Sequence, residues 1–108
     1  MNWIPVHILQ LLTIPPLFFA GSYDNTVRIW DVATKQQVAE LKGHTSNVTS
    51  VAFDSSGKYL ASGSRDKTVR VWDVSSMQQV AELKGHTDAV TSVAFDSSGK
   101  YLASGEVA

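Results

Sequence analysis

Short apolar runs separated by turn-forming residues set the pattern of this chain. In its middle part the apolar runs occupy residues 48–53, 59–62, 68–73 and 79–83, and polar segments containing Asp, Ser or Gly lie between them. Runs of this length with Val, Thr and aromatic residues are typical of β-strands. Four strands of about five residues leave no room for a crossover helix, so each strand should pair antiparallel with the next.

The alternation along these strands is incomplete, which bears on how the sheet is covered. In the run at 68–73, Val69 and Val71 point to one face while Arg70 and Trp72 point to the other, yet the face with Trp72 is hardly polar. A sheet with apolar or small residues on both faces needs cover on both. Sheets stacked face to face around an axis provide that cover and leave only short edges.

The whole pattern recurs at a fixed period. Residues 21–62 and 63–104 align without a gap over 42 positions, of which 34 are identical and eight differ. A fixed-period repeat indicates that one supersecondary unit is stacked along the chain. We therefore interpret 21–62 and 63–104 as two copies of one repeat and 105–108 as a truncated tail.

Length and composition exclude several classes of protein. The 108 residues suffice for one small domain, and nine Lys and Arg against ten Asp and Glu give no basic field for nucleic acid. The chain has no cysteine, so disulfides, thiolate metal sites and a cysteine nucleophile are excluded. A protein without cysteine is compatible with a cytoplasmic or nuclear location, which is what we expect.

The apolar segment 1–20 differs from the repeats. It lacks the positive residues that open a signal peptide, and Pro5, Pro15 and Pro16 make it a poor membrane-spanning helix. Residues 17–22 match the register of 59–64, which favours degenerate strands of the same repeat. A membrane anchor formed by this segment is the alternative.

The spacing of these motifs resembles the WD-repeat β-propeller family. A Gly-His pair opens each unit, a Trp-Asp pair closes its third strand, and an Asp stands in the turn before that strand. These residues are Gly43-His44 and Gly85-His86, Trp30-Asp31 and Trp72-Asp73, and Asp24 and Asp66. The resemblance covers residues 21–104 and implies an all-β fold, a partial β-propeller of four-stranded antiparallel WD-repeat blades.

The resemblance also implies a hydrogen-bonded tetrad in each complete blade. In this sequence the tetrad would be His44, Ser62, Asp66 and Trp72. Its Ser, His and Asp could be mistaken for a catalytic triad. We interpret them as structural, because blade architecture explains all four residues and the sequence has no nucleophile elbow.

The other copies carry only parts of this tetrad. The first has Asp24 and Trp30, and the last has His86 and Ser104 before the chain stops. The chain thus holds about two to two and a half blades, whereas propellers usually close with four to eight. It is therefore interpreted as part of a larger propeller, with self-association of identical chains into a ring as an alternative.

Differences between the two copies mark candidate binding positions. Seven of the eight lie in expected loops, and we single out Tyr23, Arg65, Lys67 and Asp88, since Arg and Tyr are enriched at binding hot spots. The implied function is a non-catalytic scaffold for complex assembly, with other proteins as partners. We expect no cofactor and no metal, because His44 and His86 lack the spacing of ligands.

Overall fold

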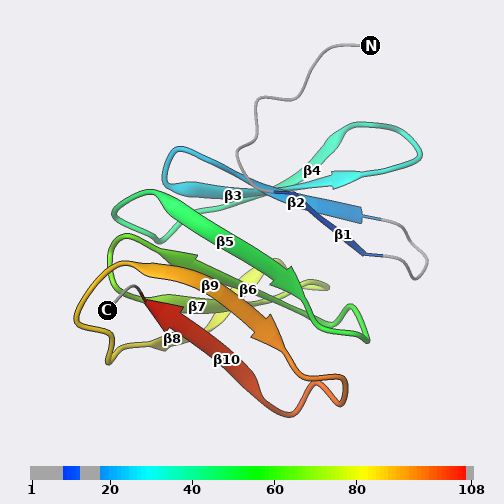
Figure 1. Cartoon of the computed structure of the whole chain (residues 1–108). Coiled ribbons are helices and arrows are strands. Elements are labelled where there is room, and N and C mark those ends of the chain that lie inside the picture. Colours follow the sequence, from blue (N-terminus) through cyan, green and yellow to red (C-terminus); the bar gives the residue numbers. More distant parts are fainter. Residues whose placement is uncertain (1–8, 13–17, 107–108) are drawn as a thin grey trace.

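The computed structural model describes residues 9–12 and 18–106, and of residues 9–12, 18–19 and 21–23 it describes the backbone alone. The described residues form ten strands and no helix. Figure 1 shows them as three stacked sheets. The all-β fold class is confirmed, and the antiparallel four-stranded sheets are those expected of WD-repeat blades.

Each complete sheet is a four-stranded antiparallel meander. The first contains β1 (Leu9–Leu12), β2 (Phe18–Tyr23), β3 (Thr26–Asp31) and β4 (Gln37–Leu41), and the second β5 (Val48–Phe53), β6 (Tyr59–Ser64), β7 (Val69–Asp73) and β8 (Gln78–Leu83). A two-stranded sheet contains β9 (Val90–Phe95) and β10 (Leu102–Glu106). The second and third sheets begin with the same sequence, Val-Thr-Ser-Val-Ala-Phe, because they repeat one unit.

Local hydrogen bonds explain the turns between paired strands. In the turn from β5 to β6, the Asp54 carboxylate accepts hydrogen bonds from the Tyr59 amide at 3.0 Å and from Ser56 Oγ at 2.7 Å. Gly57 has a φ of 75°, a left-handed conformation that glycine adopts without strain. Asp96, Ser98 and Tyr101 repeat these bonds between β9 and β10.

The core lies between the sheets, in two clusters. Val27, Ile29, Val51, Leu60 and Trp72 belong to a buried cluster that joins the first sheet to the second. Ala61, Val69, Val90 and Val93 form another between the second sheet and β9. Both faces of the second sheet are therefore covered, which is why its strands show incomplete alternation.

The predicted N-terminal segment 1–20 lies only partly within the described residues. Its residues 9–12 form β1 and pair with 18–21, with Leu9 opposite Gly21. In the part of the chain that the structure describes, no helix is long and apolar enough to cross a membrane.

Candidate functional site

The structure brings the four predicted tetrad residues together in the second sheet. Trp72 Nε1 donates to Ser62 Oγ at 2.9 Å, and Ser62 Oγ lies 2.7 Å from His44 Nε2. On the other side of the ring, His44 Nδ1 lies 2.8 Å from Asp66 Oδ2. A neutral His44 that donates from Nδ1 and accepts at Nε2 satisfies every partner. Each residue then donates to the next, from Trp72 through Ser62 and His44 to Asp66.

Four different segments position these side chains. His44 precedes β5, Ser62 lies in β6, Asp66 in the following turn and Trp72 in β7. In the β6–β7 register, Ser62 pairs with Arg70 and Leu60 with Trp72, so the indole lies diagonally across from Ser62. The tetrad therefore fixes the loop before β5 against the β6–β7 turn.

Burial and hydrogen bonding shift the pKa values of the His44–Asp66 pair. Burial lowers the pKa of His44 below 6.5, and its hydrogen bond to Asp66 offsets only part of that effect. Burial alone would raise the pKa of Asp66, but hydrogen bonds from Thr68, His44 and Thr45 outweigh it, and the pKa falls to about 2. The pair is thus a neutral imidazole beside an ionised carboxylate.

Three further residues, which the sequence analysis did not name, support the tetrad. The Thr45 amide donates to Asp66 Oδ2 at 3.0 Å, and the Thr68 amide and hydroxyl both donate to Asp66 Oδ1. Ser64 Oγ accepts a hydrogen bond from the Asp66 amide at 3.0 Å. A Thr or Ser two residues from the turn aspartate is the signal that could have indicated this network.

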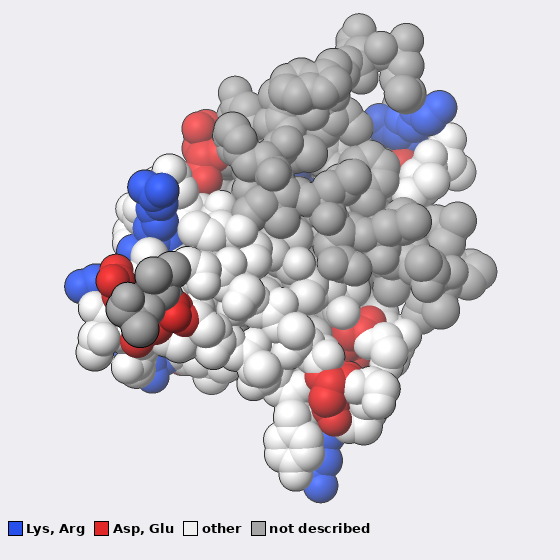
Figure 2. Space-filling model, viewed as in Figure 1, with Lys and Arg blue, Asp and Glu red and all other residues white. Residues whose placement is uncertain are grey.

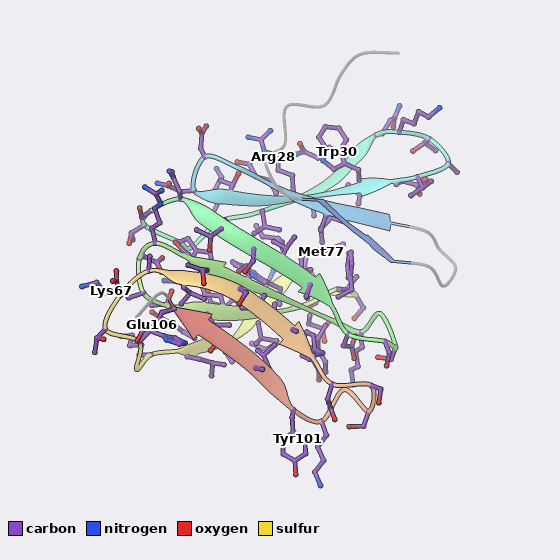
Figure 3. The ribbon with its side chains drawn as sticks, in the orientation of Figure 1. Arg28, Trp30, Lys67, Met77, Tyr101 and Glu106 are labelled. Carbon is purple, nitrogen blue, oxygen red and sulfur yellow. The ribbon has the colours of Figure 1, made fainter. Side chains whose placement is uncertain are left out.

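The first sheet holds a different arrangement. Ala20 is buried where Ser62 stands in the second sheet, so it offers no hydroxyl to an indole. Asp24 is exposed in the β2–β3 turn. Figure 3 shows Trp30 on the side of the first sheet away from the second. Asn2, which stands at the position of His44, lies outside the described residues.

The third sheet keeps half of the tetrad and adds a new member. His86 Nε2 lies 2.7 Å from Ser104 Oγ, the distance of the His44–Ser62 contact. Glu106, which the sequence analysis assigned to the tail, ends β10 with an Oε2 atom 3.4 Å from His86 Nδ1. Glu106 Oε2 also accepts a hydrogen bond from the Asp88 amide at 2.7 Å. In the repeat register Glu106 replaces Ser64, and this difference is the sequence signal for its role.

The predicted binding residues lie at one end of the strands. Arg65, Lys67 and Asp88 are exposed in the β6–β7 turn and the loop before β9. Lys67 projects outward at the same end as Glu106, as Figure 3 shows. The backbone of Tyr23 ends β2 opposite Thr26, and its side chain is not among those described. We call the exposed loops 24–25, 45–47, 65–68 and 87–89 the loop face.

A hollow lies on the loop face between the first two sheets. It measures about 290 Å³, and Asp24, Asn47, Thr49 and Arg65 line it. The Arg65 amide donates to the Asn47 carbonyl at 2.9 Å, which holds the two loops together. Among the described residues no cluster of His, Asp or Glu has the arrangement of a metal site.

Comparison with known sequences identifies the repeat. The profile of the family described as "WD domain, G-beta repeat" matches residues 11–31, 35–73 and 77–107. The chain belongs to this family. The matches are offset from the sheets by one strand: the second match contains β4 of the first sheet with β5 to β7, and the third contains β8 of the second sheet with β9 and β10. The first and third matches extend into the segments 1–20 and 105–108.

Several WD-repeat relatives are similar over part of the chain. Periodic tryptophan protein 2 of Arabidopsis thaliana is 41% identical over 58 residues, which cover 54% of this chain and 6% of that protein. Coatomer subunit beta'-1 of Arabidopsis thaliana is 47% identical over 38 residues, or 35% of this chain and 4% of that protein. Dynein assembly factor with WD repeat domains 1 of Danio rerio is 35% identical over 57 residues, which cover 48% of this chain and 14% of that protein. The chain therefore spans a small fraction of the length of these relatives.

Members of the WD-repeat family typically act as protein-interaction scaffolds. The names of the relatives above include an assembly factor and a coatomer subunit. Fold alone does not fix function, so the role of this chain has to be argued from its surfaces.

Proposed function

We propose that this WD-repeat chain is a non-catalytic protein–protein interaction scaffold that binds partners through its loop face. The observation that carries the proposal is the rigid support of exposed loops. Asp66 is anchored by His44, Thr45 and Thr68, while its neighbours Arg65 and Lys67 point into solvent. A binding surface held on a rigid base loses little conformational entropy when it binds.

The chemistry of the loop face suggests the kind of partner. Arg65 and Lys67 place two cations in one turn, and Asp88 adds an anion in the loop of the neighbouring sheet. A protein surface with acidic groups opposite the turn and a basic group opposite Asp88 would be complementary. The hollow beside Arg65 would accept a side chain from such a partner.

A comparison of two double variants tests this proposal. Arg65→Ala with Lys67→Ala alters the loop face, and Ser75→Ala with Ser76→Ala alters the exposed β7–β8 loop as a matched control. We expect proteins captured by the wild-type chain and by the control to be lost from the loop-face variant. Capture that is the same with both double variants would rule out this face.

The non-catalytic part of the proposal rests on the environment of Ser62. The side chain is fully buried, and its oxygen accepts the indole N–H of Trp72, so a substrate carbonyl cannot approach it. Ser104 occupies the position of Ser62 in the next copy of the repeat and is exposed, so it is the serine that a substrate could reach more easily. Hydrolysis of an activated ester that Ser104→Ala or Ser62→Ala abolishes without unfolding the chain would contradict this part.

Membrane anchoring through residues 1–20 is the alternative in another class. It predicts that the chain pellets with membranes after a salt wash and that deletion of 1–20 releases it. A scaffold that is not anchored should remain in the supernatant after the same salt wash, and this readout leaves β1 and β2 of the first sheet intact.

A further inference from the structure

The hollow on the loop face lies between side chains of opposite charge. Asp24 in the β2–β3 turn belongs to the first sheet and Arg65 in the β6–β7 turn to the second, and both are exposed and line the hollow. Figure 2 shows acidic and basic side chains together at the end of the molecule where Figure 1 places these two turns. The two walls of the hollow therefore attract different groups.

The side chains of Asp24, Asn47 and Arg65 are available to a ligand. In the part of the chain that the structure describes, none of these three side chains has a hydrogen bond or an ion pair. Asp66, which stands one period after Asp24, differs because its carboxylate is occupied by the hydrogen bonds of the tetrad. An unpaired carboxylate, an amide and an unpaired guanidinium thus line one small space.

Hydrogen bonds hold the backbone that carries Asn47 and Arg65. The Arg65 amide and Ser64 Oγ both donate to the Asn47 carbonyl at 2.9 Å, and Ser64 is fully buried. Thr49 Oγ1, in the wall of the hollow, donates to the Gly63 carbonyl at 3.2 Å. A ligand would therefore have to order only the ends of side chains, which keeps the entropic cost of binding low.

The next pair of sheets does not repeat this set of available groups. One period later, Ala89 stands in place of Asn47 and offers no amide. The equivalent of Asp24 is Asp66, and its carboxylate is already bonded. Among the described residues, the combination of free charges and amide is thus particular to the first two sheets.

The opposite charges decide which ligands the hollow favours. A group with negative charge alone is attracted by Arg65 but repelled by Asp24, and a purely basic group meets the reverse. A ligand with both signs side by side is attracted by both walls. A carboxylate can accept two parallel hydrogen bonds from a guanidinium. The volume of about 290 Å³ lies just below the range of pockets for drug-sized molecules and suits the ends of two side chains.

We propose that the hollow recognises an extended segment of a partner protein in which an acidic and a basic side chain lie next to each other; this rests on the proposed loop-face function. The acidic group binds Arg65 and Asn47, and the basic group binds Asp24. Side chains two residues apart lie on the same face of an extended segment, so the motif is Glu-x-Lys or Lys-x-Glu. Asp24 selects against partners whose surface is only acidic.

The test uses the full chain and a synthetic peptide of repeated Glu-Gly-Lys-Gly units, which presents the two charges in both orders. Peptides of the same length with only Glu or only Lys at the charged positions are the controls. Each peptide is titrated at low salt, and NMR shifts of the amides give the dissociation constant and the position of binding. We expect the mixed peptide to bind about fivefold more tightly than either control, because an exposed ion pair contributes up to about that factor. The shifts should lie at 24–25, 47–49 and 65.

Charge reversal identifies the two pairings. Arg65→Asp and Asp24→Arg should each weaken the mixed peptide about fivefold, whereas the double variant should restore its affinity because both signs are present again. Asp24→Asn keeps a residue type that tolerates the left-handed φ of 58° at this position, and it should abolish the preference for the mixed over the acidic peptide. Asn25→Ala, an exposed neighbour, should change neither affinity.

Tighter binding of the acidic peptide, equal binding of all three peptides, absence of binding, or additive losses in the double variant would overturn the proposal. Partner capture separates it from the loop-face function. Partners that are lost from the variant with Arg65→Ala and Lys67→Ala but retained by Asp24→Asn would overturn only the recognition of paired charges. Partners that both variants retain would contradict the loop-face function as well.

Discussion

Ser62 shows how one small hydroxyl holds several segments together. It accepts from Trp72 and contacts His44, with distances of 2.9 and 2.7 Å, in a fully buried position. Because both partners are buried polar groups, loss of the hydroxyl leaves an indole N–H and a ring nitrogen without their bonds. Such groups are expensive to leave unsatisfied in an interior.

Ser62→Ala should therefore lower the free energy of unfolding by about 2–4 kcal/mol. Ser104→Ala removes the same side chain from an exposed site and should cost less than about 1 kcal/mol. Urea unfolding followed by tryptophan fluorescence measures both variants under the same conditions. An equal loss of unfolding free energy in the two variants would show that the buried hydrogen bonds of Ser62 stabilise the fold no more than the exposed one of Ser104.

The His44–Asp66 pair should make stability fall in acid in two stages. The pKa of His44 is lowered, so the unfolded chain binds its proton more tightly, and stability is lost as the pH falls below about 6.5. The pKa of Asp66 is about 2, so its contribution is present above about 4 and is lost as the pH falls towards 2.

The pH series is measured by thermal unfolding between pH 7 and pH 2. In His44→Gln the melting temperature should fall less between pH 7 and pH 5 than it does in the wild type. In Asp66→Asn the melting temperature should fall less below pH 4. Hydrogen bonds from neighbouring serines also lower the pKa values of Asp73 and Asp96. Both variants should therefore still lose some stability in acid. An unchanged profile in His44→Gln would mean that the buried imidazole does not control the first stage.

At the scale of strands and sheets, the repeat provides a matched pair of glycines. A Cβ atom on Gly63 in β6 would lie 2.6 Å from Val90 Cγ1 and 3.1 Å from Val93 Cγ1, both across the interface with β9. A Cβ atom on Gly105 in β10 would meet only Ser92 Oγ within 4 Å, at 3.3 Å. Identical positions in two copies thus differ only in what covers them.

Gly63→Ala should destabilise the chain by about 1–3 kcal/mol, because the sheets must separate to admit the methyl group. Gly105→Ala should change stability by less than about 1 kcal/mol, since a serine hydroxyl can rotate away and alanine restricts the unfolded chain. Thermal unfolding of both variants checks the difference. A neutral Gly63→Ala would mean that β9 does not pack on β6 as closely as the structure has it.

The strands of the second sheet could be predicted closely from the sequence, and the contacts at the ends of the chain could not. Residues 48–53 were predicted and observed as one strand, because the run of Val, Thr and Phe is short and the Asp-Ser-Ser-Gly turn ends it. The strand Leu9–Leu12 was harder to predict, because the segment around it is largely apolar without clear alternation and is interrupted by proline. Glu106 was missed because its role depends on a longer side chain reaching back to His86, which strand patterns do not encode.

At the scale of the whole molecule, the three sheets are unequally protected. The second sheet is covered on both faces, and β6 is buried along almost its whole length, with the burial running from Leu60 to Ser64. In β9 and β10 the outward side chains Ser92, Ala94 and Ala103 are exposed, although the equivalent residues of the second sheet are at least partly covered. Figure 1 places β9 and β10 at the opposite side of the stack from the first sheet.

Protection from amide hydrogen exchange should follow this order. The amides of β6 and β7 should exchange most slowly, because they lie inside a sheet that opens only when both flanking sheets detach. Those of β8 and β10 should exchange faster, because each strand has one open edge and mostly exposed or half-exposed side chains. Exchange measured by NMR or mass spectrometry gives the ranking, and Gly63→Ala should accelerate exchange in β9 and β10 more than in β3. Uniform exchange across all three sheets would contradict this prediction. It would indicate that the three sheets unfold together and that the second sheet is no more stable than the sheets beside it.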